Sequence, residues 1–208
     1  MGLLFRFVFF MFFFALLTGG CGIFRPRLHS GDLIFQDLDC PLCEAIENAT
    51  EGYRGKPVSH MGIVYRRGDS LYVLEAYDKV RLTPWDTFIR RSPKIMIGRL
   101  KRPYRKYISE ALRRGLNLRG KPYDDEFRLH NGKYYCSELV YEVFRDEEGK
   151  PLFFLEPMNF NNLKTGRPDS AWIEYFKTLH KKIPQGEPGC NPASYSRSSL
   201  LKILYSTY

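Results

Sequence analysis

Cys136 stands at a position where a thiol could do chemistry. It lies in the stretch GKYYCSELVYEVF, residues 132–144. The apolar residues that follow it at positions i+3, i+4, i+7 and i+8 are Leu139, Val140, Val143 and Phe144. This spacing predicts a helix that begins near Cys136 and places the cysteine at the N-terminal end of its buried face. The unpaired amides and the dipole at a helix N-terminus favour a nucleophilic thiolate, although a small core cysteine would show the same pattern.

A nucleophilic thiol needs a base, and the chain holds four histidines, at positions 29, 60, 130 and 180. His60 differs from the others because it opens a β-rich run, SHMGIVY, at residues 59–65. The next run, SLYVLEAY at residues 70–77, carries Glu75. The sequence therefore offers one imidazole and one carboxylate on neighbouring predicted strands.

A hairpin between these two strands would bring the imidazole and the carboxylate together. Tyr65 and Ser70 flank RRGD, so symmetric pairing matches residues whose numbers sum to 135 and sets His60 opposite Glu75. Opposed residues share one sheet face, with Cβ atoms about 5 Å apart. There the carboxylate can fix the tautomer and stabilise the imidazolium. A purely structural pair is the alternative, and a slip of one residue would separate the two groups.

The rest of the chain predicts an α+β domain with an antiparallel sheet. The β-rich runs, broken by Gly, Asp and Pro, are residues 30–36, 59–65, 70–77, 80–83 and 94–100. Thr83 and Pro84 occupy cap and first-turn positions of a short helix that ends at residue 91. Further helical patterns occur at residues 107–118, 171–180 and 196–205, and residues 181–192 are rich in Pro and Gly and predict an irregular loop.

The N-terminal residues do not belong to that domain. One cation, Arg6, precedes an uncharged apolar run at residues 7–17, which is too short to span a bilayer but suits a signal peptide. Cys21 follows LTGG, which resembles a lipoprotein cleavage box, although Thr18 stands where leucine is usual. We expect a signal peptide at residues 1–20 and lipidation at Cys21, with plain secretion or an uncleaved anchor as alternatives.

Length and charge limit what the exported part can be. A chain of 208 residues suits one domain, which we expect at residues 21–208, with a core at about 28–145 and a C-terminal helical extension at about 146–208. The net charge of +9 becomes +8 without Arg6, which suits anionic phospholipids or wall polymers, or serves solubility alone. We see no tight basic cluster with interleaved aromatics, so nucleic acid is not an expected partner.

The remaining cysteines indicate no metal site. Cys40 and Cys43 form DCPLC, which fits a disulfide, two free thiols at a helix start, or redox or metal chemistry. A structural zinc site needs a second pair of ligands at matching spacing, and none is visible. Cys190 lies in the predicted loop at residues 181–192. We expect no metal and no cofactor.

Together these segments resemble a known family. NlpC-type cell-wall peptidases carry a helix-start DCSGL, then GDLVFF, HVGIY and IHA. Here GDLIF, HMGIVY and LEA occur in that order, but the cysteine segment YCSELV comes last, which is a circular permutation. With TPW and GKPYD between them, the segments are similar to the YiiX/YaeF group of permuted papain-like amidases over roughly residues 30–144.

The resemblance implies a circularly permuted papain-like fold, with an antiparallel sheet packed against helices and the nucleophile at a helix N-terminus. It makes Cys136 the nucleophile, His60 the general base and Glu75 the orienting acid, although the peptidases often have a histidine at this third position. The Cys136 amide is the natural oxyanion donor. The substrate-cleft residues that it implies are Ser59, Tyr123, Asp124 and Tyr135, of which Tyr123 and Asp124 could equally be structural.

The function implied is that of an exported, membrane-anchored cysteine amidase of the bacterial envelope, on its periplasmic or surface face. A Cys-His-Glu triad would hydrolyse peptidoglycan stem-peptide amides or N-acyl amides. Two alternatives stay open. One is a thiol-dependent lipid acyltransferase that uses the same residues, and the other is a non-catalytic lipoprotein that binds wall fragments.

Overall fold

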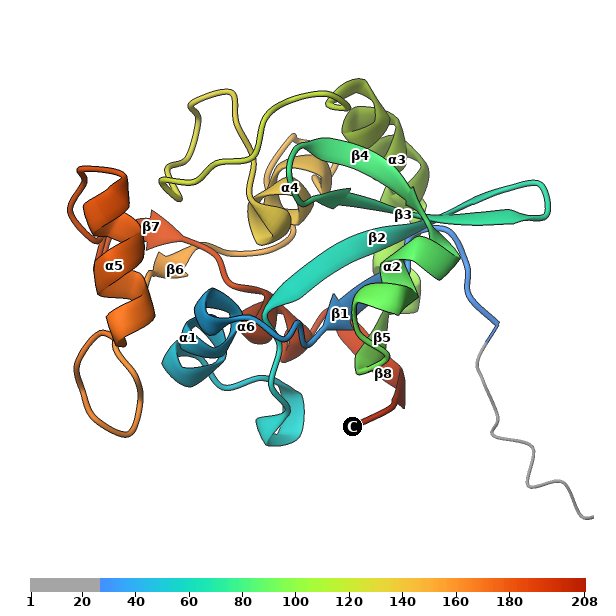
Figure 1. Cartoon of the computed structure of the whole chain (residues 1–208). Helices are drawn as coiled ribbons and strands as arrows, with labels where there is room; N and C mark the ends of the chain where they lie inside the picture. The colour runs from blue at the N-terminus through green and yellow to red at the C-terminus, as the bar shows by residue number, and fades with distance from the viewer. Residues whose placement is uncertain (1–26) are drawn as a thin grey trace, which may run out of the picture.

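A six-stranded antiparallel sheet organises residues 27–208, the part of the chain that the computed structural model describes (Figure 1). Its strands lie in the order β4-β3-β2-β1-β5-β8. They are β1 (Leu33–Gln36), β2 (His60–Arg67), β3 (Ser70–Ala76), β4 (Val80–Pro84), β5 (Ile95–Leu100) and β8 (Leu201–Ser206). The α+β class with an antiparallel sheet is therefore confirmed.

Helices cover both faces of this sheet, and residues of β1 alternate between them. Leu33 and Phe35 pack into the larger core beneath α3 (Ile108–Asn117) and α4 (Cys136–Val143). Ile34 packs into a smaller core with Phe88 of α2 (Trp85–Arg91) on the opposite face. All four residues of β1 are buried, because a strand covered on both faces has no polar side.

The other elements form a second group beside the sheet (Figure 1). They are α1 (Pro41–Ala49), α5 (Ser170–Thr178), α6 (Pro192–Ser196), a two-stranded sheet of β6 (Glu156–Pro157) and β7 (Pro188–Gly189), and the short 3₁₀ turn η1 (Tyr53–Gly55). A second 3₁₀ turn, η2 (Arg102–Tyr107), instead leads into α3 and packs against it. An aromatic core joins α5 to α1 and includes Phe127, Phe160 and Trp172. This group supplies most of the walls of the site described below.

The pairing of β2 with β3 differs from the predicted register. Arg67 pairs with Ser70 and Ile63 with Leu74, so paired numbers sum to 137 and the turn consists of residues 68 and 69. His60 therefore lies two positions away from direct opposition to Glu75. Because side chains alternate with a period of two, a shift of two residues leaves both groups on the same face.

The C-terminal segment is more than a helical extension. Residues 196–205 were predicted as a helix, but α6 ends at Ser196 and β8 then pairs with β5. A free edge of β5 offers unpaired backbone groups, and pairing with it outweighs the local helical pattern. The last strand of the chain thus completes the sheet.

The predicted signal peptide at residues 1–20 and the predicted lipidation site Cys21 lie outside the described residues. Between residues 27 and 208, no helix combines the length and the apolar character needed to cross a membrane.

Candidate active site

Helix α4 positions Cys136 at its first residue. The helix packs against β2 and β3 through Leu139, Val140 and Val143, and the thiol is 5% exposed. Glu138 Oε2 accepts a hydrogen bond from the Tyr135 amide at 3.3 Å, which ties the helix start together. The Cys136 amide belongs to the first helical turn, whose N–H groups have no acceptor within the helix. It is therefore available to an oxyanion formed at the thiol.

His60 is the first residue of β2 and connects the thiol to a carboxylate. Its Nε2 atom lies 2.6 Å from Glu75 Oε2. An ionised carboxylate only accepts hydrogen bonds, so Nε2–H donates. Cys136 is also close enough to the imidazole to contribute to its pKa. Tyr77 and Phe88 contact the imidazole, with ring centroids at 5.7 and 6.0 Å.

These contacts favour the protonated imidazole. Burial lowers the pKa of His60, but the hydrogen bonds to Cys136 and Glu75 and the charges of both partners raise it more, to about 9. The imidazolium is therefore held between an anion on one side and the thiol on the other. Such a pair favours the thiolate form that acts as a nucleophile.

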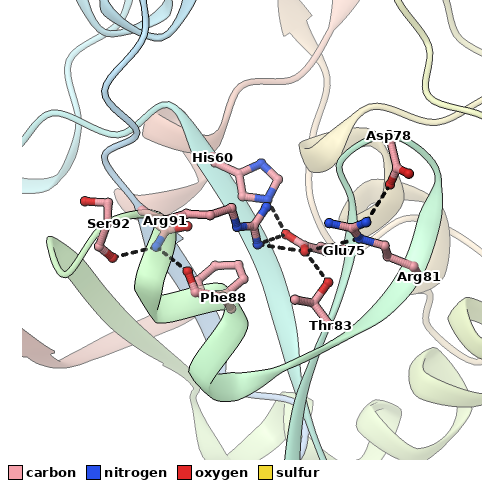
Figure 2. Close-up of polar contacts among 9 residues, drawn as sticks. His60, Glu75, Asp78, Arg81, Thr83, Phe88, Arg91 and Ser92 are labelled. Carbon is pink, nitrogen blue, oxygen red and sulfur yellow. Dashed lines mark hydrogen bonds and ion pairs between the residues drawn. The ribbon is translucent and has the colours of Figure 1, made fainter.

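Glu75 is fully buried and accepts hydrogen bonds from three side chains, and Arg81 Nε forms an ion pair with its Oε1 at 3.8 Å (Figure 2). Arg91 Nη2 lies 2.7 Å from each carboxylate oxygen, Thr83 Oγ1 donates to Oε1, and His60 donates to Oε2. Burial raises the pKa of Glu75, but the interactions with His60 and Arg91 outweigh it and lower the pKa to about 2. The carboxylate therefore stays ionised at neutral pH.

The sequence analysis missed the hydrogen bonds that Thr83 and Arg91 donate to Glu75. Thr83 was predicted to cap the helix at residues 84–91, but Pro84 is the N-cap and Thr83 points from β4 to the carboxylate. The register between β3 and β4 could have predicted Thr83 as a partner of Glu75. It pairs Arg81 with Glu75, and residue 83 lies on the same face of the sheet as residue 81. Arg91 reaches the site from the last turn of α2, and no local pattern marks it.

A cavity of about 380 Å³ opens beside the thiol. Of the residues predicted for the site, Cys136, Ser59, Tyr123 and Tyr135 line it. Its apolar wall includes Met158, Phe160 and Trp172, and Glu156 and Arg197 add opposite charges. Most of these lining residues come from the segment after residue 150, which the sequence analysis did not connect with the site.

Asp124 differs from its predicted place, because it does not line this cavity. It is fully buried, and its carboxylate accepts hydrogen bonds from the backbone amides of Glu126 and Arg128. It stabilises the turn that follows Tyr123 and so supports the cavity wall without forming it. Tyr123 stays a neutral phenol, because burial and the nearby Cys136 raise its pKa well above the ordinary value.

The other cysteines have structural surroundings. Cys190 lines the cavity, accepts a hydrogen bond from Ser137 Oγ at its carbonyl, and has a thiol pKa that burial raises to about 12. Its amide donates to Tyr135 Oη at 3.2 Å. Cys40 and Cys43 form a disulfide at the start of α1, so of the three alternatives for this pair the structure shows the disulfide.

A thiol at a helix N-terminus, an imidazole on the adjacent strand and a carboxylate behind the imidazole define a papain-like cysteine hydrolase site. Here the nucleophile follows the histidine strand in the chain. The family model described as "Permuted papain-like amidase enzyme, YaeF/YiiX, C92 family" matches residues 27–205. The chain belongs to this family.

Two relatives agree with this assignment. The uncharacterized protein YiiX of Escherichia coli (strain K12) is 31% identical over 132 residues, which are 61% of this chain and 62% of that protein. The crystal structure of "metalloprotein yiiX" from Escherichia coli O157:H7 has a TM-score of 0.73 at 24% identity, covering 86% of this chain and 98% of the other. The second likeness shows the fold, a permuted papain-like fold.

Proposed function

We propose that this protein is a cysteine-dependent amide hydrolase of the bacterial cell envelope, with Cys136 as nucleophile, His60 as general acid and base, and Glu75 as the orienting carboxylate. The observation that carries the proposal is the geometry of His60. Its Nε2 is fixed by Glu75 at 2.6 Å, and Cys136, which lines the cavity, is close enough to the imidazole to raise its pKa.

The proposed reaction has two acyl-transfer steps. The Cys136 thiolate attacks the amide carbonyl carbon, and the oxyanion that forms accepts a hydrogen bond from the Cys136 amide. The His60 imidazolium gives its proton to the leaving amine as the C–N bond breaks, which leaves a thioester. His60 then takes a proton from water as the water attacks the thioester, and the acid and the thiol are released.

Glu75 acts through the imidazole. It fixes the ring orientation and stabilises the imidazolium, and Arg91 and Thr83 in turn fix the carboxylate. The aromatic rings of Tyr77 and Phe88 lie against both His60 and Arg91, with the Arg91 guanidinium 4.2 Å from the Tyr77 centroid and 4.7 Å from the Phe88 centroid. His60 itself is only 4% exposed, so the base is largely excluded from water.

The lining of the cavity suits amide substrates that have both an apolar and a polar part. Phe160 and Trp172 offer an apolar wall, whereas Glu156 and Arg197 can pair with charged groups of a substrate. Stem-peptide amides of peptidoglycan and N-acyl amides both meet this description. Lipidation at Cys21, proposed from the sequence, would hold the enzyme at the envelope membrane where such amides occur.

The donor groups in the described part of the chain do not fit a metal ion, although the related YiiX structure is described as a metalloprotein. Among residues 27–208, no group of three or more His, Cys, Asp or Glu side chains is arranged to bind one. Both oxygens of Glu75 already accept hydrogen bonds from Arg91. The proposed mechanism therefore assigns no step to a metal.

The test is to incubate the protein with a muropeptide digest and, separately, with N-acyl amides, and to follow products and protein mass. We expect released amine, together with an acyl group on the Cys136 peptide in quenched samples. Cys136→Ala should show neither, whereas Cys190→Ala, which alters the same cavity, should show both. Product that forms only with an added amine or alcohol acceptor would change the assignment to acyl transfer. Tight binding of fragments without turnover would favour a non-catalytic binder.

A further inference from the structure

Most of the net positive charge of the protein is concentrated in one segment. Residues 101–121 contain eight Lys and Arg side chains and a single acid, Glu110, which gives a net charge of +7 out of +9 for the whole chain. Two tyrosines, Tyr104 and Tyr107, lie among the cations. Our interpretation that basic residues form no cluster is therefore wrong for this segment.

The structure turns these cations outward. Ala111, Leu112 and Gly115 bury one face of α3, so the charged side chains of the segment lie on the outer face. Acids neutralise only some of them: Glu110 pairs with Arg113 and Arg114, and Glu147 pairs with Lys106. The cations that are exposed and make no ion pair with any residue between 27 and 208 are Lys101, Arg102, Arg105, Arg119 and Lys121.

This segment adjoins the place where the described chain begins. The Gly31 backbone packs against the Ile108 side chain at the start of α3, so closely that a Cβ at residue 31 would lie 2.4 Å from it. The Arg66 amide donates to Ser30 Oγ, which brings in the β2–β3 hairpin with its exposed Arg66 and Arg67. In Figure 1 this hairpin and the first described residues project on the same side of the sheet.

We propose that this basic surface, formed by Arg66, Arg67, Lys101, Arg102, Arg105, Arg119 and Lys121, binds the anionic phospholipid headgroups of a bilayer. Cys21, the proposed lipidation site, precedes the first described residue by six positions, which span at most about 22 Å when extended. A membrane that holds the lipid anchor is therefore within reach of the surface. Each unpaired cation near an anionic membrane adds attraction that salt screens.

Binding of this surface would also place the reaction near the membrane. Tyr123 lines the active-site cavity and follows Lys121 by two residues. Along the chain, one end of the basic surface therefore lies two residues from a residue that lines the cavity.

The test measures how the full-length protein partitions onto vesicles of phosphatidylcholine alone and of phosphatidylcholine mixed with phosphatidylglycerol. The ratio of the two partition coefficients removes the contribution of the proposed N-terminal lipid anchor, which acts on both vesicles. We expect a ratio well above one that falls as salt is added. Lys101→Gln/Arg102→Gln should lower the ratio roughly tenfold or more.

A matched control comes from the far side of the molecule. Lys164 and Lys182 are exposed cations in the loops on either side of α5, and α5 lies away from α3 (Figure 1). Lys164→Gln/Lys182→Gln removes the same charge and should leave the ratio unchanged. A ratio near one for the wild type, or an equal fall in both variants, would overturn the proposal. It would also be overturned if soluble polyglutamate bound as tightly as the anionic vesicles through Lys101 and Arg102, because the partner would then be a polymer.

Discussion

Replacing Glu75 with glutamine tests the carboxylate, but it also affects Arg91. Glutamine keeps the shape and can still accept hydrogen bonds from Thr83 and His60, whereas the guanidinium of Arg91 loses its counter-charge. Arg91 is only 16% exposed, and its Nε and Nη1 atoms are buried with no hydrogen-bond partner among residues 27–208. Glu75→Gln should therefore leave a buried guanidinium without its counter-charge. Arg91→Gln should leave the buried carboxylate with only His60 and the more distant Arg81 as cationic partners.

The size of the effect follows from the contact. Charge centres about 4 Å apart interact by about 4 kcal/mol at an effective dielectric constant of about 20, and loss of one partner of a buried pair costs about 3–5 kcal/mol. We expect each single variant to lose about 3 kcal/mol in the free energy of unfolding. The double variant Glu75→Gln/Arg91→Gln should lose clearly less than the sum, because neither charge is then unpaired.

The assay combines urea unfolding with the rate at which iodoacetamide alkylates Cys136 at pH 7. Stability should recover in part in the double variant, but alkylation should not. Only Glu75 supports the imidazolium directly, so both variants that lack it should label at least about tenfold more slowly than the wild type. Arg91→Gln should label at an intermediate rate, because the carboxylate remains but is less firmly held.

Two results would refute this reasoning. Additive stability losses in the double variant would show that the two charges are not coupled. Wild-type alkylation in a folded Glu75→Gln variant would show that the carboxylate does not act on His60, whatever its distance.

Three further predictions concern single positions. Burial raises the pKa of Glu138 to about 8, whereas its value is near 4.5 in the unfolded chain. The folded state should therefore lose stability as the pH rises from about 4.5 to 8. Glu138→Gln should remove this pH dependence from unfolding curves measured over that range. A Cβ at Gly62 would lie 2.4 Å from Val73 Cγ1 and 3.3 Å from Glu75 Cβ. Gly62→Ala should therefore lower the free energy of unfolding by about 1–3 kcal/mol in thermal unfolding and slow the alkylation of Cys136. Unchanged stability and alkylation would mean that the strands move apart without cost. Cys21→Ala should abolish labelling by a radioactive fatty acid in cells, and an unlabelled wild type would remove the proposed anchor.

The sequence predicted the parts of the site that depend on local patterns. Strands β1 to β5 and helices α3 and α4 follow alternation and helical spacing, which the chain carries within each segment. His60 and Glu75 were placed on one face although the register was wrong by two residues, because only an odd shift moves a side chain to the other face. The prediction that the two side chains share a face was therefore correct although the predicted register was not.

The parts that could not be predicted depend on contacts between distant segments. Arg91 reaches Glu75 because α2 packs across β3 and β4, and strand β8 forms because β5 offers a free edge. The cavity walls at Phe160, Trp172 and Arg197 come together only when the segment after residue 150 folds against α1 and α4. Periodicity within a segment contains no information about such contacts.

The central claim is that His60 makes Cys136 a nucleophile, and the most direct measurement is the alkylation rate of each cysteine at pH 7 in the wild type and in His60→Ala. An ordinary thiol is only a few per cent ionised at this pH, whereas the His60 imidazolium, with a pKa of about 9, is present to stabilise the Cys136 thiolate. Peptide mass spectrometry gives both rates in one sample, with Cys190 as the internal reference. The account predicts that Cys136 labels at least about tenfold faster in the wild type than in His60→Ala, while the slow rate of Cys190 is the same in both proteins. A Cys136 rate that is unaffected by His60→Ala would contradict it.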